Sequence, residues 1–184
     1  MKPKILLAAT CGALCVKLTC PLTAASTPYP IAIAQSVTPS QWQEVSSTDG
    51  KFVVTMPGVP KLKSEDFSGR MNHTLKFAKG KELYLVRYFD LDSALTPTNI
   101  KLTLNSLVGT FVVGANAKLV EVRDISINDY PGKVFEFKSI IPQQPPGIGQ
   151  VFIVDQRIYG MIVTTPEPEK AQRFIESFRL LEER

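Results

Sequence analysis

The stretch from Trp42 to Pro60 constrains the fold more than any other part of the sequence. An aromatic-led run is followed by Asp49-Gly50, and a second run from Phe52 to Met56 ends at Pro57. Asp-Gly is a common hairpin turn because glycine takes positive φ without strain, and proline cannot donate a hydrogen bond to a continuing strand. The folded part of the chain therefore opens with a β-hairpin, on which later elements should pair or pack.

Alternating or apolar runs separated by turn residues continue along the chain, and they predict further strands. The predicted strands cover residues 61–67, 71–77, 82–89, 118–127, 133–140, 150–154 and 157–164. Both faces of the run from Glu82 to Phe89 are largely apolar. This run is therefore predicted to be a central strand that is covered on both sides.

Two stretches have helical periodicity. Thr96-Pro97 is a typical helix start, and apolar residues recur at helical spacing from Ile100 to Phe111 before Gly114. Part of this stretch also alternates like a strand, but its length favours a helix. A second helix is predicted after Pro166, with an apolar stripe formed by Ala171, Phe174, Ile175 and Phe178. The predicted class is α+β, with a mainly antiparallel sheet of hairpins and two helices packed on it.

The first 41 residues differ in character from the rest of the chain. A basic start at Met1-Lys2-Pro3-Lys4 precedes an apolar run from Ile5 to Val16, which is typical of a signal peptide and too short for a bilayer-spanning helix. We expect a signal peptide over 1–25, with cleavage possible as late as 34, then a disordered linker over 26–41 and a single domain over 42–184. An extracytoplasmic location such as a periplasm follows.

Cleavage would remove all the cysteines, Cys11, Cys15 and Cys20, and would lower the formal charge from +4 to +1. Disulfide-linked partners and cysteine chemistry are then excluded. Lysine and arginine alternate with acidic residues along the domain, instead of forming the basic face of a nucleic-acid binder.

Several of these motifs together resemble the PsbP-like family of exported α/β proteins. They are the Trp42 strand, the pattern Asp49-Gly50-x-Phe52-x-Val54-x-Met56-Pro57, the hairpin at Tyr130-Pro131-Gly132 and the closing Phe174-Ile175-Glu176-Ser177-Phe178 segment. The resemblance spans about 41–181. It implies an extrinsic protein of a thylakoid lumen that binds photosystem II or helps to assemble it, and it identifies no site residue here.

Catalytic candidates are few. His73 is the single histidine, and the sequence contains no G-x-S-x-G motif, so we predict a non-enzymatic protein without a cofactor. Asp90 and Asp92 follow a predicted strand and are weak candidates for a hard-cation site or an acid/base pair. The alternative for these carboxylates is a polar loop that leads into the helix.

The loop from Ile140 to Gly149 is the strongest candidate for a partner contact, through Ile140, Ile141, Gln143 and Gln144. A variable surface connection is the competing interpretation, and Gly147-Ile148-Gly149 is predicted to be a turn. The predicted function is that of an accessory or binding protein, which associates with photosystem II or another membrane complex. A carboxylate-based hydrolase and a carrier of a small apolar ligand are the alternatives.

Overall fold

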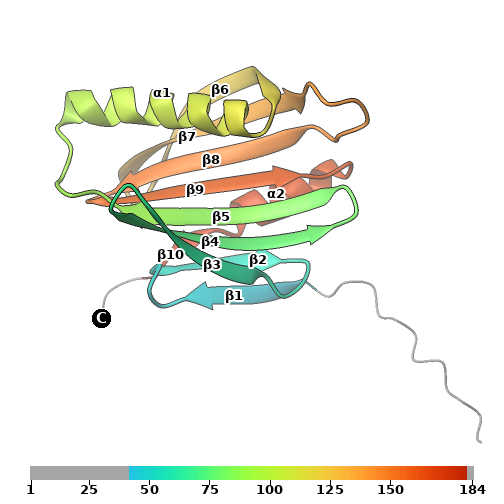
Figure 1. Ribbon diagram of the computed structural model, residues 1–184, viewed down its shortest axis with the longest axis horizontal. Coiled ribbons are helices and arrows are strands. Elements are labelled where there is room, and N and C mark those ends of the chain that lie inside the picture. Colours follow the sequence, from blue (N-terminus) through green and yellow to red (C-terminus); the bar gives the residue numbers. More distant parts are fainter. Residues whose placement is uncertain (1–41, 182–184) are drawn as a thin grey trace, which may run out of the picture. The chain divides into compact units, whose positions relative to one another are not determined.

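The computed structural model describes residues 42–181. The predicted signal peptide, both possible cleavage sites and the linker lie outside the described residues. Within 42–181 the chain forms ten strands and two helices, in two antiparallel sheets (Figure 1). The predicted α+β class is confirmed, with one refinement: the opening hairpin belongs to a small sheet of its own.

The small sheet has three strands in the order β1-β2-β10. Its members are β1 (Gln43–Ser47), β2 (Phe52–Met56) and the short β10 (Arg179–Leu180). The turn between β1 and β2 differs in detail from the prediction, because Lys51, and not Gly50, has a positive φ of 51°. Glycine is required at position 50 for space, since a Cβ there would lie 2.5 Å from the ring of Phe52.

The large sheet has seven strands in the order β3-β4-β5-β9-β8-β7-β6. They are β3 (Lys61–Phe67), β4 (Arg70–Lys79), β5 (Glu82–Asp90), β6 (Ala117–Ile127), β7 (Tyr130–Ser139), β8 (Gly147–Val154) and β9 (Arg157–Thr164). The middle strand is β9, whose residues 158–163 are all buried. The prediction that Glu82–Phe89 is central was therefore wrong in part: Tyr84, Val86 and Tyr88 are buried, but the opposite face of β5 is only half-buried.

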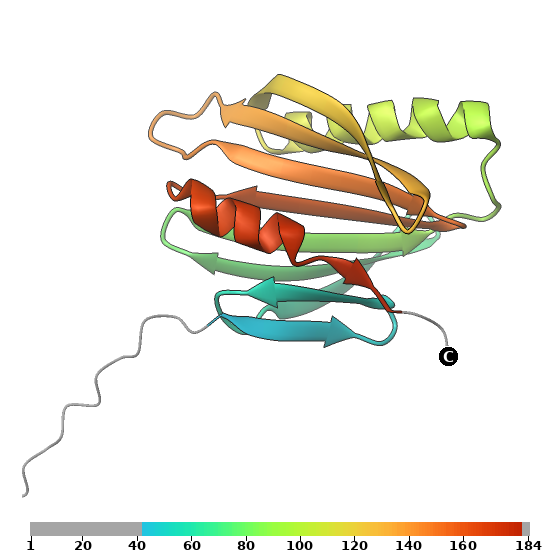
Figure 2. The ribbon, with the colours of Figure 1, turned by 180° about the vertical axis from the view of Figure 1, so that it is seen from behind.

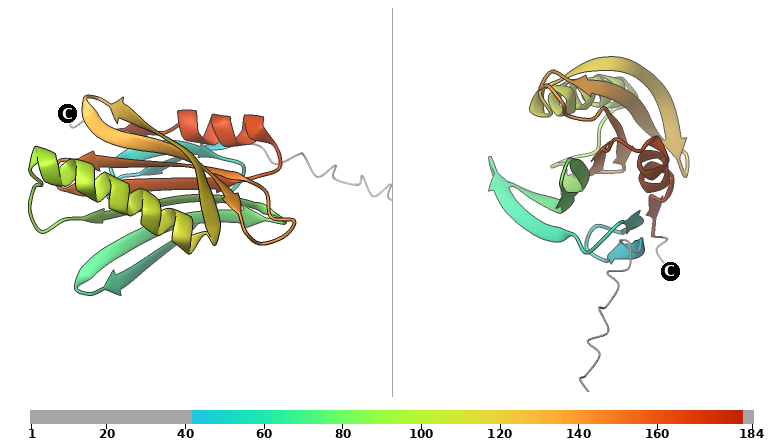
Figure 3. Two further views of the ribbon diagram at one scale, coloured as in Figure 1. Left: turned by 90° about the horizontal axis from the view of Figure 1, so that it is seen from above. Right: turned by 90° about the vertical axis from the view of Figure 1, so that its right-hand side faces the viewer.

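The helices cover opposite faces of the large sheet (Figures 2 and 3). Helix α1 (Pro97–Gly114) begins at Thr96, whose side chain accepts a hydrogen bond from the Asn99 backbone N–H at 3.4 Å. It packs Leu104, Val108 and Val112 onto β7, β8 and β9. Burial of this stripe is the physical reason why the segment is a helix, although part of it alternates like a strand.

Helix α2 (Pro168–Glu176) and the small sheet together cover the other face. Ala171, Phe174 and Ile175 form the buried stripe of α2, as predicted. Phe178 lies beyond the end of the helix, which is a correction to the predicted stripe, but it is buried in the same core. Its ring stacks on Phe52 at 5.4 Å between centroids.

The segment Gly147-Ile148-Gly149 is the first part of β8 and not a turn, so this prediction was wrong. Both glycines are buried opposite phenylalanines of β7. A Cβ at Gly147 would lie 2.2 Å from the ring of Phe137, and one at Gly149 would lie 2.2 Å from the ring of Phe135. Glycine is used here because two large rings from the neighbouring strand occupy the space of the missing side chains.

Candidate functional site

The loop between β7 and β8 runs from 140 to 146 and has an ordered pattern of backbone contacts. The Ile140 N–H donates to the Asn116 carbonyl at 2.8 Å, and the Ile141 N–H donates to Ser139 Oγ at 3.1 Å. Gln143 takes a positive φ of 64°, which allows the Gln144 N–H to reach the Ile141 carbonyl at 3.3 Å. The loop backbone is thus hydrogen-bonded to the segment after α1 and within its own turn.

The loop leaves two large apolar side chains in solvent. Ile140 is 59% exposed and Ile141 is 44% exposed, while Gln143 and Gln144 are exposed polar neighbours. The structure therefore places all four residues of the predicted contact at the surface. An exposed pair of isoleucines on an ordered loop is a surface that water solvates poorly.

Sequence reasoning missed the apolar neighbours of this loop. Val113, at the end of α1, is 76% exposed and is joined to the loop through Asn116, whose N–H donates to the Val113 carbonyl at 3.0 Å. On the edge strand β6, Leu119 and Val120 are 46% and 53% exposed, and the register shift between Leu119 and Glu121 leaves Val120 unpaired. We call the set Val113, Leu119, Val120, Ile140 and Ile141 the apolar end.

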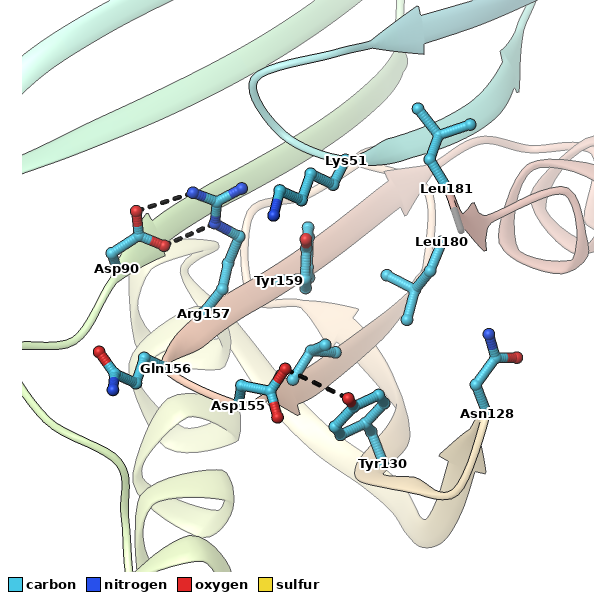
Figure 4. A pocket seen from close by; sticks show the side chains of 11 residues that line it. Lys51, Asp90, Asn128, Tyr130, Asp155, Gln156, Arg157, Tyr159, Leu180 and Leu181 are labelled. Carbon is cyan, nitrogen blue, oxygen red and sulfur yellow. Dashed lines mark hydrogen bonds and ion pairs between the residues drawn. The ribbon is translucent and has the colours of Figure 1, made fainter. Parts of the chain in front are cut away.

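A polar cavity of about 570 Å³ lies at the other end of the large sheet from this loop, next to the β8–β9 turn (Figure 4). The β6–β7 turn and the β1–β2 turn also line it. Arg157 is its best-connected residue. Its Nε and Nη2 donate to the two carboxylate oxygens of Asp90 at 2.5 and 2.8 Å, and its Nη1 donates to the Asp49 carbonyl at 2.6 Å. Beside it, the buried Tyr159 hydroxyl donates to the Gly50 carbonyl at 2.8 Å.

These contacts explain the electrostatics of the cavity. The double hydrogen bond from Arg157 lowers the pKa of Asp90 below its usual range, and the same bond raises the pKa of Arg157. Burial raises the pKa of Tyr159. At neutral pH Asp90 is therefore ionised and Tyr159 keeps its proton. Through their hydrogen bonds to Asp49 and Gly50, Arg157 and Tyr159 connect the β1–β2 turn to the large sheet.

The structure does not bring Asp90 and Asp92 together. Asp90 is bound by Arg157 and lines the polar cavity, whereas Asp92 accepts a hydrogen bond from Arg70 Nη2 at 2.6 Å and lines a different cavity. His73 also has a structural environment, with its Nδ1 2.8 Å from Ser64 Oγ and its ring stacked on Tyr88. No group of three or more metal-ligating side chains occurs within residues 42–181.

The second cavity is a groove of about 940 Å³ between α1, β5 and the β3–β4 hairpin. Its floor and one wall are apolar, with Leu83, Leu85 and Phe89 from β5 and Leu107 and Phe111 from α1. The sequence signalled this feature only indirectly, as the second apolar face of the Glu82–Phe89 strand. That face was assigned to a fully covered core, because a sequence does not show how far a helix extends across a sheet.

The chain has the PsbP-like α+β fold. A search of solved structures finds the solution structure of cyanobacterial PsbP (CyanoP) from Synechocystis sp. PCC 6803, with a TM-score of 0.55 and 13% sequence identity. The match covers 83% of this chain and 99% of that one. No protein-family model matches the sequence, and neither does any curated protein. The structural likeness therefore shows the fold.

Neither α1 nor α2 is both long enough and apolar enough to pass through a membrane, and these are the helices of residues 42–181.

Proposed function

We propose that this protein is a non-enzymatic, extracytoplasmic accessory protein that binds a protein partner through the apolar end. The partner is a subunit of a membrane complex, and photosystem II is the first candidate because of the PsbP-like fold. The observation that carries the proposal is the exposure of Ile140 and Ile141 on a loop whose backbone is hydrogen-bonded in place.

The apolar end has the properties of a preformed contact. Its side chains come from three elements, and the hydrogen bonds through Asn116 hold two of these elements together before any partner arrives. Little conformational entropy is then lost on binding, so that more of the burial energy contributes to affinity. Apolar residues on a fixed surface are typical of protein interaction sites.

The compartment is part of the same proposal. The predicted signal peptide supports export, and a soluble domain outside the cytoplasm could reach the exposed parts of a membrane complex. Fractionation should find a chain that has lost its first 25 to 34 residues outside the cytoplasm. A full-length cytosolic protein would contradict this assignment.

The partner contact is tested by capture from solubilised membranes with the tagged protein. The wild type should retain specific subunits, and the double variant Ile140→Asp/Ile141→Asp should lose them, because two charges would have to be buried at the contact. Leu102→Asp is the matched control, since Leu102 is 63% exposed on α1 but is not part of the apolar end. Photosystem II subunits in the capture would identify the complex.

Two results would contradict the proposal. Equal capture by the wild type and the double variant would show that the apolar end is not the contact. If Leu102→Asp lost capture to the same extent, any added surface charge would prevent capture, and the effect would not be specific to the apolar end. The hydrolase alternative is less well supported, because Asp90 and Asp92 bind different arginines and line different cavities.

A further inference from the structure

The two edge strands of the large sheet differ in regularity. β6 has a bulge between Leu119 and Glu121, and bulges at an edge hinder pairing with a further strand. β3 has neither a bulge nor a proline, and its seven residues pair with β4 without any register shift. All seven are exposed, and the β3–β4 hairpin extends away from both helices (Figure 3). β3 therefore presents a regular edge to which another strand can be added.

The β3–β4 turn determines which backbone groups of β3 point outward. Ser68 and Gly69 have φ of 56° and 81°, which is typical of a two-residue type I′ turn. In such a hairpin the flanking pair, Phe67 and Arg70, exchanges both backbone hydrogen bonds, and bonding then alternates along the strands. The N–H and C=O groups that point away from β4 are therefore those of Leu62, Ser64 and Asp66. Within residues 42–181 no other backbone group bonds them.

The charges of β3 change sign at Ser64. Lys61 and Lys63 precede this residue, and Glu65 and Asp66 follow it. Lys63 and Glu65 lie on one face of the strand and form an ion pair at 2.5 Å, with side chains that are 69% and 60% exposed. An ion pair this exposed contributes little to the stability of one copy. The same arrangement is complementary in charge to an identical strand that runs in the opposite direction.

We propose that β3 pairs antiparallel with β3 of a second copy of this chain, about a two-fold axis at Ser64. Ser64 then lies opposite its own counterpart, and the outward backbone groups of Leu62 and Asp66 bond each other across the axis. Lys63 lies opposite Glu65 of the second copy in a pair without backbone hydrogen bonds, where the Cβ atoms of an antiparallel sheet are about 4.5 to 5.5 Å apart. The two lysines and two glutamates that meet there alternate in sign.

Charge and hydrogen bonding select this register. A shift of one residue would place outward-pointing backbone groups opposite groups that already bond β4. A shift of two residues would place Lys63 opposite Lys63, or Glu65 opposite Glu65, and like charges directly opposite each other are destabilising. The centred register pairs all seven residues without a like-charge contact. A strand from another protein would need the same pattern in reverse to fit equally well, so the second copy is the occupant that this edge favours.

The pairing is limited to two copies. Each copy uses its regular edge, and the outer edges of the joined sheet are then the bulged β6 strands. A two-fold dimer is therefore expected, and not a fibre. One seven-residue strand is a small interface, so we expect a Kd on the order of 10 μM. The dimer uses no residue of the apolar end, so this inference and the proposed function can fail independently.

Analytical ultracentrifugation of the purified protein, from about 1 μM to about 1 mM, tests the dimer. The wild type should change from monomer to dimer over this range. Lys63→Glu and Glu65→Lys should each weaken dimerisation at least tenfold, because each variant places like charges opposite each other at two positions. Arg123→Glu is the matched control and should dimerise like the wild type. Arg123 forms the same kind of exposed ion pair, with Glu121, but on the other edge strand.

Charge exchange tests the register itself. A mixture of Lys63→Glu with Glu65→Lys should form a heterodimer, because position 63 of each copy again lies opposite the opposite charge at position 65 of the other. The double variant Lys63→Glu/Glu65→Lys should dimerise like the wild type for the same reason. A contact between other surfaces would not produce this recovery. Circular dichroism and thermal unfolding should show that all the variants fold like the wild type.

Amide hydrogen exchange locates the contact. Between low and high protein concentration, exchange should slow severalfold at the N–H groups of Leu62, Ser64 and Asp66. The N–H groups of Lys63 and Glu65 already bond β4 and should change little. A monomer throughout the concentration range, dimerisation that Lys63→Glu does not weaken, or failure of the mixed variants to associate would each overturn the inference. Slower exchange confined to the apolar end would also overturn it, because the contact would then lie on another surface.

Discussion

Truncation of Phe178 tests how the layer formed by α2 and the small sheet is held on the large sheet. Its ring is 7% exposed and lies between the sheets, stacked on Phe52 at 5.4 Å and on Phe152 at 6.2 Å, with Tyr159 edge-on at 5.6 Å. Phe178→Ala should therefore lower the free energy of unfolding by about 3 to 5 kcal/mol, the usual cost for a core phenylalanine. For a domain of this size, that corresponds to a melting temperature roughly 10 to 15 °C lower.

Denaturant and thermal unfolding of the purified protein measure this change directly. Phe67→Ala is the matched control, because the same atoms are removed from a ring that is 74% exposed, and its effect should stay within about 0.5 kcal/mol. Glu176→Ala, on the exposed side of α2, should be equally mild. If Phe178→Ala were as stable as these controls, the small sheet and α2 would not be packed on the large sheet as described.

Three further changes test other contacts. Asp90→Asn should lower stability at pH 7 by no more than about 1 kcal/mol, because the ion pair with Arg157 is partly exposed. Since the pKa of Asp90 is lowered in the folded state, the difference should shrink as the pH falls below about 4 in acid unfolding curves. Gly149→Ala should cost about 1 to 3 kcal/mol in urea unfolding, because the new methyl group would overlap the ring of Phe135, and an unchanged midpoint would refute this packing. Burial raises the pKa of Tyr84 to about 12. The stabilisation that this shift provides is complete below about pH 10 and is lost between pH 10 and 12. Tyr84→Phe should therefore flatten the alkaline unfolding curve in that interval.

Local features of the chain were readable from the sequence because they depend on neighbouring residues. The β6–β7 hairpin turns at Asn128 and Asp129, which both take positive φ, as expected for polar turn residues between two alternating runs. The start of α1 at Thr96-Pro97 is likewise a local effect of a capping side chain and a preset φ. The exposure of Ile140 and Ile141 could be expected because they interrupt the alternation where a strand ends.

One prediction was wrong and another was wrong in part, because both depended on residues far away in the sequence. Glycines 147 and 149 resemble a turn until Phe135 and Phe137 are placed opposite them across the sheet. Similarly, β5 has two apolar faces, but the sequence does not show that α1 covers β7, β8 and β9 and leaves much of β5 open.

The sequence by itself thus determined the two helices, most of the strands, the Thr96 cap and the β6–β7 turn, and the absence of a recognisable catalytic motif. Tertiary structure decided where the elements lie. Pairing of β5 with β9, which joins residues about 70 positions apart, places Arg157 against Asp90 in the polar cavity. The reason is that hydrogen-bonding patterns and side-chain periodicity are fixed within a few residues, whereas strand order and the reach of a helix across a sheet depend on how all the apolar faces can be buried at once.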